Sequence, residues 1–155
     1  MGKIFVLDAD GIEALLRTAL VGRIACCAHD ENEGRPYIVP LAYGYDGEAV
    51  YAFSRPGRKI AIMRRQPLVS FEVDEATAED RWRSVIAEGE YEELTTAEGR
   101  ARAIEVIFRG DPVPDLPEDT IFYRLVLTRK TGRFELPDDE AAAYAASLQT
   151  SARPA

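Results

Sequence analysis

The sequence is poor in residues that could hold a metal ion or form a covalent cross-link. Its 155 residues include only two cysteines and one histidine. A closed structural zinc site needs four such ligands, so we expect no Cys/His metal centre. Cys26 and Cys27 are adjacent, and neighbouring strand side chains point to opposite faces, so a disulfide between them would be strained. A disulfide-stabilised scaffold is therefore excluded.

Long hydrophobic segments are also missing. The longest uninterrupted apolar run is six residues, Ala141–Ala146, whereas a transmembrane helix needs about 20. Residues 1–7 are too short for the apolar region of a secretory signal, and Asp8 and Asp10 follow them directly. We therefore expect a cytoplasmic protein without a membrane partner.

Positive charge is scarce and unevenly distributed. Nineteen Lys and Arg residues against 27 Asp and Glu residues give a net charge of −8, so the chain as a whole repels polyanions. Nucleic acid is therefore not expected as a partner. Residues 49–71 contain no acidic side chain, yet residues 55–65 hold five of the cations. This local excess predicts a site for one small anion.

Hydrophobic spacing predicts a mainly β protein with peripheral helices. The dipeptide Asp46-Gly47 is the strongest hairpin signal. Because strands do not alternate strictly with helices, a small six-stranded antiparallel barrel is favoured over a doubly wound parallel sheet. We assign residues 1–136 to this single domain and residues 137–155 to a loose helix and frayed end. The expected strands are 23–28, 37–43, 49–53, 68–73, 82–91 and 121–128, and the expected helices are 10–20, 56–65 and 95–109.

The helix boundaries rest on particular residues. Asp10 and Glu13 form a capping-box arrangement at the start of the first helix, and Gly22 is expected to end it. Pro56 is typical of a first helical residue. The segment Thr95–Glu98 is a second capping box.

The segment Phe53–Lys59 passes from the end of a strand into the start of a helix. Free backbone amides at a helix N-terminus favour an anion. Arg58 and Lys59 oppose the helix dipole there, at about 0.3–1 kcal/mol each, and a bound phosphate would offset this cost. The alternative interpretation is that both are solvated side chains on an ordinary helix start.

Four segments occur in an order and spacing that is more specific than any single motif. They are Gly34–Tyr43, Tyr51–Lys59, Pro67–Val73 and Trp82–Val85, the last followed by Gly89. Together they resemble the pyridoxamine 5′-phosphate oxidase-like family of FMN-binding split barrels, in particular the subgroup that includes the nitroimidazole-resistance proteins. The likeness spans roughly residues 11–128. The predicted order of strands and helices is the order that this fold requires.

The resemblance implies that FMN is the cofactor, with its phosphate held by Arg58 and Lys59. Family members bind flavin in a cleft between two subunits, so a homodimer is also implied. A flat apolar slot with a cationic end suits such a ligand. The further contacts that the resemblance implies are Val39, Pro40, Leu41 and Tyr43 along the flavin, Phe53 and Ser54 at its ring or ribityl chain, and Trp82 and Ser84 on a later strand.

These features predict a flavin-dependent oxidoreductase acting on a small organic substrate, because the flavin itself supplies the hydride or electron step. The alternatives are a flavin carrier or sensor without turnover, and a deazaflavin- or haem-binding relative. No side-chain nucleophile or base is identified. Many nitroimidazole-resistance relatives have a histidine near the position of Phe53 or Ser54, and this chain has none there. The C-terminal segment with which true pyridoxamine phosphate oxidases bind their substrate is not recognisable after Gly132, so vitamin B6 oxidation is not favoured.

Overall fold

All strands in the described part of the chain belong to one antiparallel sheet. The structure is a computed structural model that describes residues 2–151. Its strands pair in the order β3-β2-β6-β7-β8-β5-β4, and β1 pairs with β8 outside this path. The elements are β1 (Lys3–Val6), α1 (Ala9–Thr18), β2 (Val21–Cys26), the 3-10 turn η1 (Asn32–Gly34), β3 (Tyr37–Ala42), β4 (Gly44–Tyr45), β5 (Ala49–Ser54), α2 (Arg58–Arg65), β6 (Leu68–Ala78), β7 (Arg81–Glu93), α3 (Ala97–Phe108), β8 (Ile121–Leu136) and α4 (Asp138–Ser151).

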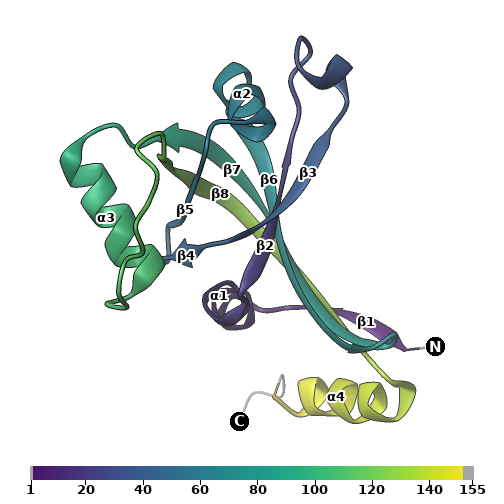
Figure 1. The fold of residues 1–155 in the computed structure, drawn as a ribbon. Helices are drawn as coiled ribbons and strands as arrows, with labels where there is room; N and C mark the ends of the chain where they lie inside the picture. Colours follow the sequence, from purple (N-terminus) through teal and green to yellow (C-terminus); the bar gives the residue numbers. More distant parts are fainter. Residues whose placement is uncertain (1, 152–155) are drawn as a thin grey trace.

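The 16-residue strand β8 joins the parts of this sheet. One of its edges pairs with β7 through residues 123–135. The other edge pairs with β5 through residues 121–126 and with β1 through residues 133–136. Figure 1 shows the sheet curling into a half-barrel, with α2 near one end and the hairpin between β6 and β7 reaching the other. The mainly antiparallel half-barrel with four helices agrees with the predicted split-barrel fold.

The main core lies on the inner face of the curled sheet. Alternate residues of the strands point to this face, which α1 and α2 close with their own apolar stripes. The largest fully buried side chains are Leu15 and Leu16 of α1, Ile24 of β2, Val50 of β5, Ile60, Ile62 and Met63 of α2, Phe71 and Val73 of β6, Val85 of β7, and Tyr123 and Leu125 of β8.

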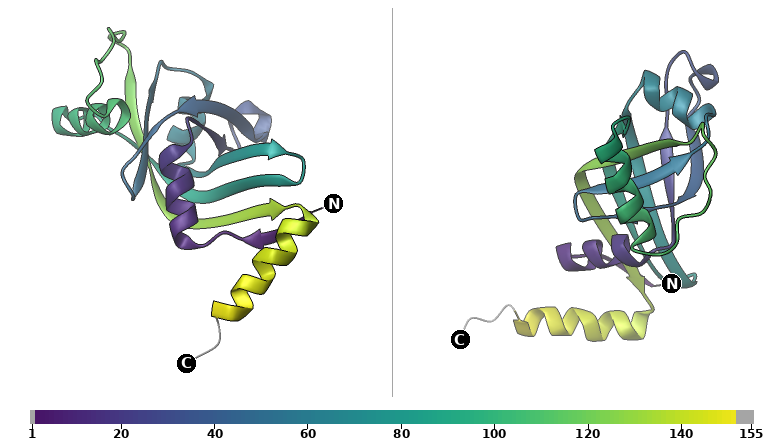
Figure 2. Two further views of the ribbon diagram at one scale, coloured as in Figure 1. Left: turned by 90° about the horizontal axis from the view of Figure 1, so that it is seen from below. Right: turned by 60° about the vertical axis from the view of Figure 1, so that its left-hand side comes forward.

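A second apolar cluster lies between α3 and the opposite face of β5. Val50 and Ala52 of β5 belong to the main core, whereas Ala49 and Tyr51 belong to this second cluster. The side chains of β5 are therefore buried on both of its faces over residues 49–52. This explains why β5 reads as a continuous apolar run and not as an alternating one. Figure 2 shows α3 lying against this part of the sheet.

The predicted ends of the first helix are wrong. Asp8, not Asp10, is the N-cap, and its side chain accepts a hydrogen bond from the backbone N–H of Gly11 at 2.8 Å. Glu13 instead reaches Lys130 of β8 and Tyr45 of β4. Gly22 does not end the helix, because it lies within β2 and is covered by the ring of Phe71.

The other two predicted helices, in contrast, begin slightly later than expected. Pro56 precedes α2, since Gly57 is its N-cap. Thr96, not Thr95, caps α3 by accepting a hydrogen bond from the N–H of Gly99 at 3.0 Å. Gly110 follows the left-handed C-cap residue of α3, as expected for the end of a helix.

The predicted strand count is two short. β1 and the two-residue β4 were not anticipated, and β8 continues to Leu136 rather than ending at Thr128. The polar run after residue 127 concealed this extension, which is stabilised by pairing with β1 and β7. The predicted turn at Asp46-Gly47 does form, and it joins β4 to β5. The longer strand before it, β3, is not part of this hairpin and pairs with β2 instead.

The C-terminal segment contains an ordered helix. In α4, Ala141 is fully buried and the ring of Tyr144 packs edge-on against Phe5 and Phe134, with centroids 4.9 and 5.3 Å away. Residues 152–155 of the predicted frayed end lie outside the described residues. Within residues 2–151, no helix has the length and apolarity needed to cross a membrane.

The packing of Phe71 over Gly22 leads to a testable prediction. A Cβ at position 22 would overlap the buried Phe71 ring, so Gly22→Ala should lower the free energy of unfolding by about 1–3 kcal/mol, the usual cost of overpacking. Urea denaturation measures this change. Gly57→Ala is the matched control, because a Cβ there meets no atom within 4 Å and the φ of 177° suits any residue. Equal stabilities of the two variants would contradict the prediction.

Candidate functional site

The turn between β5 and α2 brings two cations next to free backbone amides. β5 ends at Ser54, and α2 begins at Arg58 after an N-cap glycine that offers no side-chain cap. The first amides of a helix have no acceptor within the helix. A Cβ built on Gly57 would meet no atom of the described residues 2–151 within 4 Å, so this side of the turn is open. Amide donors, positive charge and open space together suit an anion.

Arg58 and Lys59 have no carboxylate partner within residues 2–151, unlike the neighbouring cations. The remaining cations of residues 55–65 are all paired: Arg55 with Asp119 at 3.1 Å, Arg64 with Glu93 at 2.8 Å, and Arg65 with Asp30 at 3.5 Å. The positive charge predicted for this segment is therefore concentrated at the first turn of α2.

Lys59 is also partly withdrawn from water. Its side chain is half-buried, and this burial lowers the pKa of its ammonium group. The titratable group acting on it is the buried thiol of Cys26. Burial raises the pKa of that thiol to about 11, so it is neutral at physiological pH and supplies no counter-charge. A desolvated ammonium without a counter-ion is costly, and a bound anion would remove the cost.

Arg58 is held over an aromatic ring. Its guanidinium carbon lies 5.6 Å from the ring centroid of Tyr37, the first residue of β3. This is a cation–π arrangement, which orients the guanidinium without neutralising it. Tyr37 was not among the predicted cofactor contacts. No local pattern in the sequence predicts that Tyr37 lies next to Arg58, because 20 residues of intervening chain separate the two.

The four predicted contacts around β3 occupy different environments. Val39 and Leu41 are half-buried and pack against the main core, while Pro40 points outward and is exposed. The side chain of Tyr43 is buried, packs edge-on against Phe71, and donates a hydrogen bond to the Leu16 carbonyl at 2.7 Å. The side chain of Tyr43 is therefore part of the main core.

Phe53 and Ser54 lie at the end of β5 that leads into the cationic turn. The Phe53 ring packs against Phe108 and Phe122, with centroids 5.8 and 5.7 Å away, so it belongs to the cluster beneath α3. The hydroxyl of Ser54 donates to the carbonyl of Arg55 at 3.0 Å. Neither residue has an acid–base partner in the described structure.

Trp82 and Ser84 lie at the opposite end of the sheet from Arg58. Trp82 is opposite Ala76 in the register of β6 and β7, and β6 starts at Leu68, shortly after α2 ends. The eight residue-to-residue steps from Leu68 to Ala76 span about 26 Å at the usual strand rise. Figure 1 shows α2 and the tip of this hairpin at opposite ends of the molecule. Within a single chain, the predicted contacts Trp82 and Ser84 therefore lie far from the predicted contact Arg58.

Metal ligands do not gather anywhere in the part of the chain that is described. Residues 2–151 contain no group of three or more His, Cys, Asp or Glu side chains arranged to hold a metal ion.

Burial of Tyr43 generates a second prediction. Burial raises its pKa to about 12, whereas an unfolded tyrosine titrates near 10. The folded state therefore keeps this proton longer, and the stability it contributes is present below pH 10 and lost as the pH rises through 12. Tyr43→Phe should lower the free energy of unfolding at pH 8 by about 1 kcal/mol, through loss of the hydrogen bond to Leu16, and should make the decline above pH 10 shallower.

Urea denaturation at pH 8 to 11.5 measures both effects. Tyr37→Phe is the control at pH 8, because the Tyr37 ring lies at the cationic turn and its change to phenylalanine leaves the core intact. An unchanged free energy of unfolding in Tyr43→Phe would show that its hydroxyl does not stabilise the core.

Comparison with known proteins agrees with this architecture. The chain is 37% identical to an FAD-binding protein of Mesorhizobium loti of known structure, with a TM-score of 0.70 over 86% of this chain and 99% of that one. It also shares its fold with a protein of Bacteroides thetaiotaomicron provisionally named a 5-nitroimidazole antibiotic resistance protein, at 21% identity and a TM-score of 0.72 over 86% and 89% of the two chains.

A sequence relative and a family match complete the comparison. The uncharacterized protein RA0666 of Rhizobium meliloti (strain 1021) is 36% identical over 94 residues, which are 61% of this chain and 60% of that protein. The chain thus spans about three fifths of the curated relative that it matches. Residues 8–134 match the family described as pyridoxamine 5′-phosphate oxidase. With most of its length covered by that match, the chain belongs to the pyridoxamine 5′-phosphate oxidase family.

Proposed function

We propose that the protein binds FMN through its phosphate at the first turn of α2 and acts as a flavin-dependent oxidoreductase on a small organic substrate. The observation that carries this proposal is the pair Arg58 and Lys59, which have no carboxylate partner within residues 2–151 although every other cation of residues 55–65 has one. The ammonium group of half-buried Lys59 has already lost part of its hydration, so a bound anion would stabilise its charge.

The surroundings of the turn fit a flavin nucleotide. Open space at Gly57 lets a phosphate approach the free amides of α2. Tyr37, Val39 and Leu41 lie on one face of β3 and continue from the cationic end, as a flat aromatic ligand requires. The relation to an FAD-binding protein of M. loti at 37% identity supports a flavin.

A homodimer would reunite the separated contacts. Trp82 is about 26 Å and Ser84 about 20 Å along the sheet from the end that carries α2, so a second chain must supply them if they touch the same flavin. The outer face of β2 and β3 offers a surface for such a partner, because exposed Ile38, Pro40 and Ala42 follow one another on this face of β3 and exposed Val21 of β2 lies opposite Ala42. Contiguous exposed apolar residues of this kind are typical of interaction surfaces.

The chain's own residues bind and orient the cofactor in this proposal. A bound flavin supplies hydride or electron transfer itself. A flavin carrier or sensor is the second candidate, because the turn offers no acid–base pair: the Ser54 hydroxyl is engaged with the Arg55 carbonyl, and the Cys26 thiol is neutral. Reduction of the flavin-loaded protein by NADH or NADPH, followed by transfer to added acceptors, separates the two candidates.

The phosphate contact is tested by cofactor affinity. The double variant Arg58→Gln/Lys59→Gln should weaken FMN binding by at least about tenfold, since each charge-assisted hydrogen bond contributes about 1.5–3 kcal/mol. Binding of riboflavin, which lacks the phosphate, should stay unchanged. Calorimetric or fluorescence titration measures both dissociation constants, and FAD titrated alongside decides which nucleotide binds more tightly.

Arg64→Gln is the matched control for this experiment. Arg64 lies on the same helix but is occupied by Glu93, so its loss should leave FMN affinity unaltered. If the double variant and the wild type bound FMN equally well, or if the loss were as large for riboflavin, the phosphate site would lie elsewhere.

The dimer is tested by molar mass. Ile38 is 65% exposed on the outer face of β3, so Ile38→Glu should not disturb the core but should convert the dimer into a monomer in size-exclusion chromatography with light scattering. Leu148→Glu changes an exposed leucine of α4 and should keep the wild-type mass. A monomeric wild-type protein in the presence of FMN would refute the dimer.

A further inference from the structure

A cavity of about 370 Å³ lies where the C-terminal ends of α1 and α3 meet β4 and the turn that follows it. Figure 1 shows these elements next to one another. The volume is in the range of small-molecule sites. The residues that line this α1–α3 cavity are Arg17 of α1, Tyr45 and Asp46 of β4 and the turn, and Arg102, Glu105, Val106 and Arg109 of α3 and its C-cap. Arginine is thus the most frequent residue in its walls.

One face of α3 forms a wall of the cavity. Residues 102, 105 and 106 recur at three- and four-residue spacing and therefore lie on the same side of the helix, and Arg109 follows as its C-cap. The backbone of α3 approaches β4 closely at Gly44, where a Cβ would lie 2.3 Å from the carbonyl oxygen of Val106. The absence of a side chain at Gly44 thus lets α3 bring its arginines up to the turn between β4 and β5.

Arg102 is neutralised by the carboxylates of the lining. Its guanidinium pairs with Asp46 at 3.2 Å and with Glu105 at 2.9 Å. Asp46 also accepts hydrogen bonds from the backbone N–H groups of Glu48 and Ala49, at 3.0 and 2.9 Å. Both carboxylates of the lining are therefore engaged, and neither pairs with the other two arginines.

Arg17 and Arg109 keep their positive charge. The guanidinium carbon of Arg17 lies 5.4 Å from the ring centroid of Tyr45, an arrangement that orients the group without neutralising it. Arg109 donates one hydrogen bond to the Arg17 carbonyl at 3.4 Å, and a guanidinium has five N–H donors. Within residues 2–151 neither arginine pairs with a carboxylate, and Glu13, one turn earlier on α1, pairs with Lys130 instead. The cavity therefore presents two oriented cations to a ligand.

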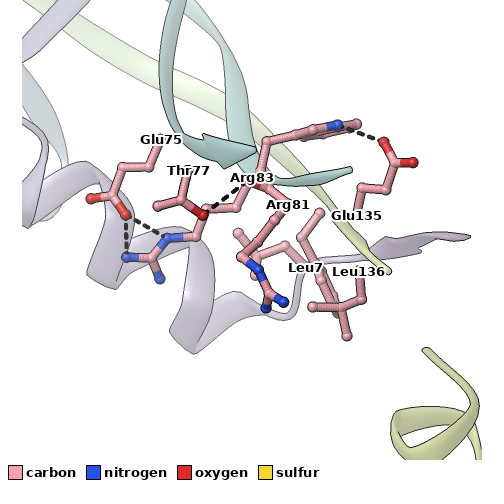
Figure 3. A pocket seen from close by; sticks show the side chains of 9 residues that line it. Leu7, Glu75, Thr77, Arg81, Arg83, Glu135 and Leu136 are labelled. Atoms are coloured by element: carbon pink, nitrogen blue, oxygen red, sulfur yellow. Dashed lines mark hydrogen bonds and ion pairs between the residues drawn. The ribbon is translucent and has the colours of Figure 1, made fainter. Parts of the chain in front are cut away.

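The arginines at the hairpin end of the sheet differ in this respect. Figure 3 shows Arg83 directed at Glu75, to which it donates at 2.7 Å. Nearby, Arg81 pairs with Glu140 of α4. Because these guanidiniums already have a counter-charge, they offer none to an anion.

We propose that the α1–α3 cavity binds the carboxylate group of a small, singly charged anion. Its lining carries three positive and two negative side chains, so one further negative charge balances it. The two oxygens of a carboxylate match the fork of a guanidinium. A doubly charged phosphate would leave an excess negative charge beside the C-termini of two helices, where the partial charge of the backbone is also negative. A carboxylate is therefore favoured over a phosphate.

This cavity is separate from the cationic turn before α2. Strand β5 begins at Ala49, directly after the turn that lines the cavity, and ends at Ser54, where the chain leads into α2. The five steps between these residues span about 17 Å at the usual strand rise. The two sites share no residue, so a flavin phosphate at Arg58 and Lys59 would not compete for the cavity.

Calorimetric titration of the full-length protein at pH 8 tests this inference with three probes of similar shape. The probes are benzoate, which carries one negative charge, benzamide, which is neutral, and phenyl phosphate, which carries nearly two because the second pKa of a phosphate ester is about 6. We expect benzoate to bind at least about tenfold more tightly than either of the others, since only benzoate balances the charge of the lining. Saturating FMN should leave the benzoate affinity unchanged.

Two single variants locate the binding. Arg17→Gln and Arg109→Gln each remove one unpaired charge from the lining, so each should weaken benzoate binding by at least about tenfold. Both arginines are exposed, and if one variant fails to fold the other still decides the question. Arg100→Gln is the matched control, because it makes the same charge change at an exposed position of α3 outside the lining. Its benzoate affinity should equal that of the wild type.

The outcomes separate this inference from the proposed function. If benzamide or phenyl phosphate bound as tightly as benzoate, the cavity would not select a single negative charge, and the inference would be wrong. Normal benzoate binding by both arginine variants would also overturn it, and displacement of the probe by FMN would then assign benzoate to the turn before α2. Failure of FMN to bind would refute the flavin proposal alone, because benzoate binding to this cavity does not require the cofactor.

Discussion

The pairing of β7 with β8 over 12 residues of β7 is the interaction that holds the two ends of the sheet apart. It makes one long antiparallel ribbon, to which β6 adds a third strand. At one end of this ribbon, α2 leads into β6 and β7 leads into α3. At the other end lies the hairpin tip, next to β1 and α4 (Figures 1 and 2). Because a paired strand cannot shorten, the cations of α2 and the indole of Trp82 are held apart within a single chain.

The two ends of the ribbon differ in how their charges are satisfied. At the α2 end, Arg58 and Lys59 are held by a ring and by partial burial, and within residues 2–151 no carboxylate neutralises them. At the hairpin end, Arg81 and Arg83 are each matched by a glutamate. An unmatched cation attracts an anion, whereas a matched one leaves only its apolar surroundings to a ligand. The same residue type is therefore engaged within the chain at one end and left without a counter-charge at the other.

Several features of the fold were predictable because they are local. The apolar stripe of α1, the start of α3 near residues 95–96, the turn at Asp46-Gly47 and the strands around Phe71 and Val85 all rest on spacing within a few residues. The larger errors arose where contacts between segments distant in the chain determine the local structure. The extension of β8 beyond Thr128 exists because β1 and β7 pair with it. Gly22 looked like a helix end, yet its lack of a side chain serves the close approach of Phe71.

The sequence by itself determined that an acidic chain gathers cations where a strand passes into a helix, and its motif order identified the split barrel. The first follows from residue type and short-range spacing, and the second from the resemblance of four segments to a known family. The tertiary structure alone decided which of those cations remain unpaired, that the side chain of Tyr43 serves the core, and that Trp82 lies at the opposite end of the sheet from Arg58. Ion pairing, burial and separation depend on partners distant in the chain, and strand pairing and packing bring those partners together.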